Sequence, residues 1–119
     1  GDCGISLIFF LETPELARNV ADSLQAAGMM ANNSIPNRHV YHHWDYILQK
    51  RSSDIYGHPW NDAARPCQVV YGKAMCPQSD DLLSRSVNIP LTQRMSDRHI
   101  SSCIDVINGT LERLTGKPV

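Results

Sequence analysis

The chain has 119 residues, a formal net charge of −1 at pH 7 and a hydrophobic fraction of 42%. This length and composition fit one domain with a core of its own. The dispersed Lys and Arg residues form no basic patch for nucleic acid. The longest apolar run, residues 5–11, is too short to cross a bilayer. We therefore expect a soluble, cytoplasmic domain with neither nucleic acid nor membrane as a partner.

The cysteines Cys3, Cys67, Cys76 and Cys103 include no C-x-x-C pair. The sequence therefore contains neither a zinc knuckle nor a redox motif. Their even number permits disulfides, but a domain of this size does not need them, so we expect reduced thiols. The chain starts at Gly1 rather than at Met, and we expect missing sequence upstream of it.

Residues 5–11 are rich in β-branched and aromatic side chains and have no helical period, which predicts a buried strand. A helix follows, with Thr13 as its N-cap and Pro14 in its first turn. Its apolar residues recur every four positions from 16 to 24, which predicts one buried stripe. Gly28 is placed to end this helix, because glycine adopts positive φ freely.

The middle of the chain has less regular signals. Residues 29–33 are a candidate second strand. Residues 36–66 are rich in His, Trp, Tyr and Asp and predict an ordered irregular excursion with one short helix over 44–49. An excursion of this length is uncommon in a compact domain and often carries function. Residues 67–71 are a candidate edge strand.

The last third predicts a short helix over 80–85 capped by Ser79, then an extended segment over 86–91 that includes Pro90. A long final helix is capped by Ser96 and ends at Gly116. Its apolar stripe, which we expect to pack on the sheet, is Ile100, Cys103, Ile104, Ile107, Leu111 and Leu114. Together these elements predict an α+β fold, a small mixed or antiparallel sheet with helices on one face.

His39, His42 and His43 are the first candidates for chemistry. A helix would place His39 and His43 on one face, as in helical zinc sites. However, no Glu follows His39 and no third ligand is evident, so the wall of a polar pocket is the better interpretation. Tyr41 beside these histidines supplies a flat apolar face with a polar edge, which suits a sugar or a partner surface. Trp60, in a turn-like segment, is either a lid contact or a loop anchor.

Residues 76–91 resemble the C-terminal signature of the DegT/DnrJ/StrS family of sugar aminotransferases. The shared features are a proline, a Leu-rich turn, an arginine, and a strand ending in Ile89-Pro90-Leu91, before a capped last helix. Residues 5–28 resemble the strand and helix that open the small domain in that family. Residues 39–48 look like the subgroup that contains the transaminase making 8-amino-3,8-dideoxy-octulosonate.

This resemblance implies that residues 1–119 are the C-terminal small domain of a fold-type I enzyme, and that its large domain is missing. Such enzymes use pyridoxal 5′-phosphate, usually as homodimers, to move an amino group from glutamate to a keto sugar, and the subgroup resemblance implies an octulosonate. Lys50, Lys73 and Lys117 lack the Gly-Gly context of the family's cofactor lysine, and no Asp can be assigned to the pyridine nitrogen.

The resemblance therefore places no catalytic, cofactor-binding or metal-binding residue in this chain. The candidate substrate-binding residues are His39, Tyr41, His43 and Trp60. Two alternatives from other classes stay open. One is a free-standing, non-catalytic ligand-binding or dimerisation module. The other is a small metal-dependent hydrolase built on the histidine cluster.

Overall fold

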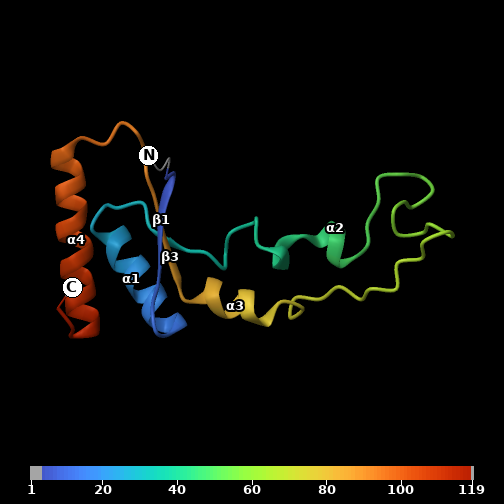
Figure 1. Cartoon of the computed structure of the whole chain (residues 1–119), viewed down its shortest axis with the longest axis horizontal. Helices are drawn as coiled ribbons and strands as arrows, with labels where there is room; N and C mark the ends of the chain where they lie inside the picture. The colour runs from blue at the N-terminus through green and yellow to red at the C-terminus, as the bar shows by residue number, and fades with distance from the viewer. Residues whose placement is uncertain (1–3, 119) are drawn as a thin grey trace.

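The computed structural model describes residues 4–118, so Gly1 and Cys3 lie outside the described residues. It has the expected α+β fold (Figure 1). The elements in chain order are β1 (Ser6–Phe10), α1 (Pro14–Ala26), β2 (Asn32–Asn33), the 3₁₀ helix η1 (Tyr41–His43), α2 (Asp45–Leu48), α3 (Pro77–Ser84), β3 (Ser86–Pro90) and α4 (Asp97–Thr115).

The three strands form an antiparallel sheet in the order β1-β3-β2. The central strand β3 supplies Val87 and Ile89 to the core, where both are almost fully buried. The edge strand β1 packs only one of its faces on this core, through Phe9. Ile8 and Phe10 alternate to the other face and are 49% and 53% exposed. The prediction of a buried strand was therefore wrong for half of β1, because an apolar run does not reveal that one sheet face is uncovered.

Helix α1 has the predicted caps. The Thr13 hydroxyl accepts a hydrogen bond from the Leu16 amide at 3.2 Å, and Pro14 occupies the first turn. Gly28 follows the helix with a φ of 85°, which a residue with a Cβ rarely adopts. The buried stripe of α1, Ala17, Val20, Ala21 and Leu24, packs against β3 and forms most of the core.

Helix α4 also begins and ends as predicted, at a Ser96 cap and at Gly116 with a φ of 68°. It packs chiefly along α1, on the same side of the sheet (Figure 1). The C-terminal part of its stripe, including Leu111, joins the core, whereas Ile100 and Ile104 are 42% and 49% exposed. The prediction that the whole stripe packs on the sheet was therefore wrong, because α1 lies between the sheet and α4.

Two predicted boundaries also differ. Helix α3 begins at Pro77 after Cys76, rather than at a Ser79 cap. Proline is favoured at the first helical position because the amide it lacks would have no partner there, and this moves the start three residues upstream. Residues 67–71 have no regular secondary structure and pair with no strand, so the predicted edge strand is absent from the described chain.

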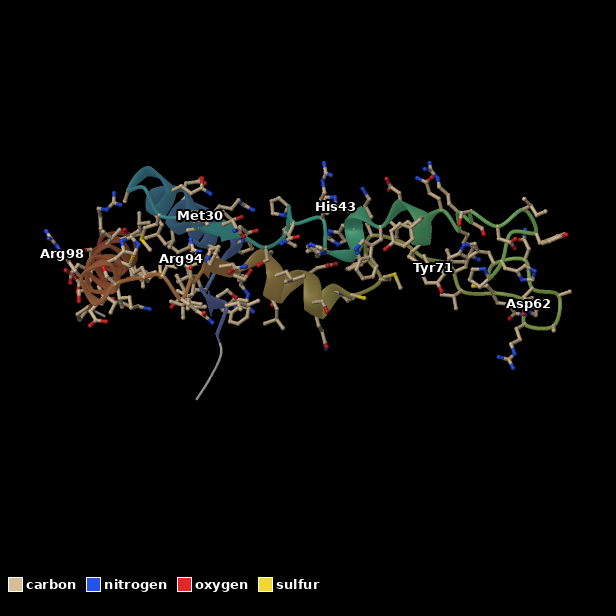
Figure 2. The ribbon with its side chains drawn as sticks, turned by 90° about the horizontal axis from the view of Figure 1, so that it is seen from above. Met30, His43, Asp62, Tyr71, Arg94 and Arg98 are labelled. Carbon is tan, nitrogen blue, oxygen red and sulfur yellow. The ribbon has the colours of Figure 1, made fainter. Side chains whose placement is uncertain are left out.

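The irregular excursion is longer than predicted and does not fold back on the body. We call residues 35–76 the arm, and residues 4–34 with 77–118 the body. The arm carries η1 and α2 and runs out to one side (Figure 1), with Asp62 near its tip (Figure 2). It extends the molecule to 59 × 31 × 27 Å and its radius of gyration to 19.5 Å. A compact domain of this length would have a radius of about 13–14 Å.

Candidate functional site at the root of the arm

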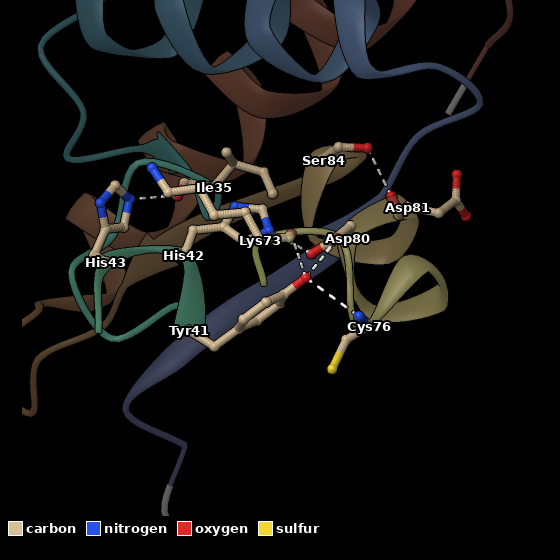
Figure 3. A network of polar contacts seen from close by, with 9 residues as sticks. All are labelled: Ile35, Tyr41, His42, His43, Lys73, Cys76, Asp80, Asp81 and Ser84. Carbon is tan, nitrogen blue, oxygen red and sulfur yellow. Dashed lines mark hydrogen bonds and ion pairs between the residues drawn. The ribbon is translucent and has the colours of Figure 1, made fainter. Parts of the chain in front are cut away.

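A group of polar side chains joins the arm to the body. We call Tyr41, His42, Lys73, Cys76 and Asp80 the root network (Figure 3). Tyr41 Oη lies 2.8 Å from Asp80 Oδ2 and 2.6 Å from the Lys73 carbonyl oxygen, and it accepts a hydrogen bond from the Cys76 amide at 3.3 Å. One phenol thus links both ends of the arm to the first turns of α3.

His42 strengthens the same joint. Its Nε2 lies 2.9 Å from Asp80 Oδ1, and the two side chains are only 21% and 24% exposed. Both atoms are shielded from solvent and have no hydrogen bond of good alignment. The imidazole nitrogen and the carboxylate oxygen are therefore in close contact without a well-aligned hydrogen bond. Asp80 contacts two of the three residues of η1 at once, Tyr41 through Oδ2 and His42 through Oδ1.

The root network fixes the protonation state of its phenol. Burial raises the pKa of Tyr41 above its ordinary value, and the hydrogen bond to Asp80 raises it further, since a phenolate would face a carboxylate. Tyr41 is therefore a neutral hydrogen-bond donor at pH 7. Its place in the site is to hold and orient neighbouring groups rather than to accept a proton.

A cavity of about 400 Å³ opens beside the root network. Its lining residues come from both ends of the arm: Arg38, His42, His43, Asp45 and Lys73. His43 Nε2 lies 3.4 Å from the Ile35 carbonyl oxygen (Figure 3), which orients the ring at the cavity wall. The lining is polar and carries two permanent cations and one carboxylate. Such a surface suits a ligand with both an anionic group and hydroxyl groups.

The structure brings together three of the four predicted substrate-binding residues. His39 and Tyr41 line a neighbouring hollow that also includes Trp44, and His43 lines the cavity itself. Trp60 lies farther out along the arm. Its indole Nε1 donates to the Arg51 carbonyl at 2.9 Å, and its ring packs edge-on against Tyr71 (labelled in Figure 2) with centroids 5.8 Å apart. Of the two interpretations of Trp60, these contacts favour the loop anchor.

Sequence reasoning named His42 as a candidate for chemistry but not as a substrate contact, and it assigned no role in this site to Arg38, Asp45, Lys73, Cys76 or Asp80. Arg38 and Asp45 lie inside the segment that was singled out, so the polar character of that segment was the available signal. Lys73 and Asp80 lie 32 and 39 residues beyond Tyr41 and carry no motif that points back to it. Only the path of the arm, which leaves and returns at the same place, brings them to the site.

Other kinds of site find less support in the described residues. Within residues 4–118, no three His, Cys, Asp or Glu side chains gather as metal ligands, and His39 and His43 line different hollows. The described cysteines, Cys67, Cys76 and Cys103, are free thiols. No helix of the described chain is both long and apolar enough to cross a membrane. In comparisons with known proteins, neither a family model nor a curated protein matches this chain.

Proposed function

We propose that this chain is the C-terminal small domain of a cytoplasmic, pyridoxal-phosphate-dependent sugar aminotransferase of the DegT/DnrJ/StrS type. In this proposal a preceding large domain supplies the cofactor lysine, and the arm reaches across to that domain or to a second subunit. The observation that carries the proposal is the arm itself, which leaves the body and exposes apolar side chains along its length.

The exposure on the arm is large for a domain that stands alone. Ile55 and Val70 are each 88% exposed and Tyr56 is 72% exposed. Each Å² of apolar surface removed from water contributes roughly 25 cal/mol, so covering these side chains would stabilise the arm substantially. Contiguous apolar patches mark protein contacts, and the exposure of these side chains supports such a contact on the arm. A large domain or partner subunit of the same enzyme would provide that contact.

The residues that carry the resemblance also have consistent structural roles. Pro77 opens α3, and Arg85 follows α3 at its junction with β3. The Arg85 guanidinium donates to the Leu11 carbonyl at 3.1 Å and pairs with Asp81 at 2.6 Å, so it ties β1 to α3. The signature is thus a set of structural joints of one small domain, which supports the family assignment without locating chemistry in these residues.

Two of the three lysines of this chain, Lys117 and Lys50, have partners that already occupy their amines. Lys117 Nζ pairs with Glu12 at 2.7 Å, and Lys50 Nζ donates to the Cys67 carbonyl at 3.0 Å. The two longest helices, α1 and α4, carry Glu15 and Asp97 in their first turns, which would repel a phosphate group from those helix ends. These features support a cofactor site in the preceding domain.

The chain's own part would be to form one wall of the substrate pocket. His39 and His43 each face a hollow at the arm root and offer hydrogen bonds to the hydroxyls of a keto sugar, an octulosonate in this proposal. Tyr41, whose hydroxyl is engaged by Asp80, offers its ring face to the same ligand. Docking of the arm on the large domain would close this wall and exclude water from the reacting groups.

The test is cofactor trapping on two proteins, this chain and the full reading frame that contains it. Each is titrated with pyridoxal phosphate, reduced with borohydride and mapped by peptide. We expect one saturable adduct on a lysine upstream of this chain, and only scattered weak adducts on the chain alone. A single saturable adduct on Lys50, Lys73 or Lys117 would overturn the assignment of the cofactor site, as would a full-length protein that binds no cofactor.

The same exposed arm also favours a second candidate, a free-standing dimerisation module without catalysis. Sedimentation and hydrogen exchange of the isolated chain distinguish the two candidates. A tight symmetric dimer that protects Ile55 and Val70 from hydrogen exchange would favour the module. A monomer whose arm becomes protected only when the large domain is present would favour the aminotransferase.

A further inference from the structure

The cavity at the arm root contains two cations that form no ion pair within the described residues. These cations, Arg38 and Lys73, both line it. Asp80, the acidic residue of the root network, already contacts His42 and Tyr41. We infer that this cavity is a binding subsite for an anionic group carried by a polyhydroxylated ligand, a sugar acid or a sugar phosphate.

The two cations reach the cavity from opposite ends of the arm. Arg38 precedes η1, and Lys73, whose own backbone carbonyl contacts Tyr41, lies shortly before α3. The root network therefore holds the backbone of Lys73 beside η1. An arginine offers a planar pair of N–H donors that matches a carboxylate or a phosphate, and a lysine adds a point charge. An anion between them would relieve their mutual repulsion.

Asp45 distinguishes this cavity from a simple anion site. Its carboxylate lines the same wall and forms no ion pair within residues 4–118. It would repel a bare anion but accept hydrogen bonds from hydroxyl groups. His42 and His43 add ring nitrogens that can donate or accept. A ligand with an anionic group at one end and hydroxyls beside it would satisfy both kinds of group.

The size of the cavity agrees with such a ligand, since about 400 Å³ falls in the range of sites for small molecules. The anion subsite stands on the cavity and its charges. Only the further step, that its ligand is the keto sugar of an aminotransferase, rests on the proposed function.

The experiment is an NMR titration of the ¹⁵N-labelled chain at constant ionic strength with three probes, gluconate, glucose 6-phosphate and glucose. We expect saturable shifts at His43, Asp45 and Lys73 with at least one of the two anions and not with glucose. A response to gluconate alone assigns the subsite to a carboxylate, and a response to glucose 6-phosphate alone assigns it to a phosphate. Shifts that do not saturate with either anion, or that glucose reproduces, would overturn the subsite.

Variants localise the response. Arg38→Gln and Lys73→Gln remove one exposed charge each and should weaken anion binding about tenfold or more, as expected for loss of a charge-assisted hydrogen bond. Arg65→Gln removes a cation that lies elsewhere on the arm and should leave binding unchanged. Equal loss in Arg65→Gln, or no loss in the first two variants, would show non-specific attraction and contradict the subsite.

Asp45→Ala tests the hydroxyl contacts separately. It should strengthen the binding of acetate, because a repulsive carboxylate is removed, and reduce the advantage of gluconate over acetate. An unchanged ratio between these two ligands would contradict the proposed place of the hydroxyls. None of these measurements involves pyridoxal phosphate, so failure of the subsite is distinct from failure of the cofactor-trapping test.

Discussion

The Asn33 side-chain amide donates to the Ser86 carbonyl at 2.9 Å and to the Ser84 carbonyl at 2.8 Å, and so binds β2 to the junction of α3 and β3. Its Oδ1 accepts from the Ile35 amide at 3.2 Å, at the point where the arm leaves the body. One side chain therefore satisfies the backbone of three segments. This explains how a strand of only two residues, β2, keeps its place at the sheet edge.

Replacing Asn33 by Ala should destabilise the body by about 1–3 kcal/mol, since buried carbonyls lose their donors. The neighbouring Asn32→Ala is the matched control, because Asn32 lies on the same short strand with its side chain exposed. Chemical denaturation at neutral pH measures both. If the two variants lose the same free energy of unfolding, the hydrogen bonds of the Asn33 amide do not hold these three segments together in solution.

Two large aliphatic residues that the sequence placed on similar stripes should behave differently. Leu24 in α1 is fully buried, and Leu24→Ala should cost about 2–5 kcal/mol through lost burial and a residual cavity. Ile104 in α4 is 49% exposed, and Ile104→Ala should change stability by no more than about 0.5 kcal/mol. If denaturation shows a large loss of stability in Ile104→Ala, another surface covers the start of α4 in solution.

These differences show which parts of the fold local chemistry determines. Caps are local, so Thr13, Ser96 and Gly116 could be assigned from the sequence alone. Which face of an element is covered depends on neighbours that lie far away in the chain. The exposed halves of β1 and α4 were therefore not predictable, since their apolar residues are as hydrophobic as those of the core.

The same distinction applies to the candidate site. His39, Tyr41 and His43 were singled out because polar and aromatic residues cluster within a few positions. Asp80 was assigned only to the first turn of a helix, where an acidic residue is ordinarily explained by the helix dipole. Its contacts to η1 depend on the return of the arm, and nothing in the local sequence encodes that return.

The pair between Asp81 and Arg85 predicts an effect of acid on stability. The hydrogen bond from Arg85 lowers the pKa of Asp81 below its ordinary value, although burial acts in the opposite direction. A carboxyl whose folded pKa is depressed contributes stability above its unfolded pKa, near 4, and this contribution is lost as the pH falls through the folded pKa. Asp81→Asn should therefore lower stability slightly at pH 7 and flatten its decline below about pH 5.

Denaturation midpoints from pH 7 to pH 3 measure this effect. Asp22→Asn is the control, because Asp22 is an exposed helix residue that forms no ion pair within residues 4–118. Its pH profile should match that of the unmodified chain. If the pH profile of Asp81→Asn runs parallel to that of the unmodified chain, the pair with Arg85 does not form in solution.

The hydrogen bonds of Tyr41 predict that the arm root loosens in alkali. The pKa of Tyr41 is raised chiefly by burial and also by its hydrogen bond to Asp80, so the neutral phenol belongs to the folded root. The stability that it contributes is complete below the unfolded pKa, about 10, and is lost as the pH rises through the folded value. Tyr41→Phe should remove this alkaline step. At neutral pH it should speed exchange of the Cys76 amide roughly 3- to 10-fold, because that amide loses its acceptor.

Hydrogen exchange at residues 35–45 and 72–80 between about pH 7 and pH 11, a range that spans the ordinary tyrosine pKa, measures this opening. Tyr46→Phe is the matched control, because Tyr46 lies on the arm, is 55% exposed, and makes no hydrogen bond through its hydroxyl within the described chain. The pKa of Tyr71 is also raised, chiefly by its hydrogen bond with Cys67. Tyr71→Phe is therefore a second control, which shows whether exchange at the root follows the ionisation of Tyr71. If exchange at the root follows Tyr71 rather than Tyr41, or stays constant in Tyr41→Phe, then Asp80 and His42 hold the arm without the phenol.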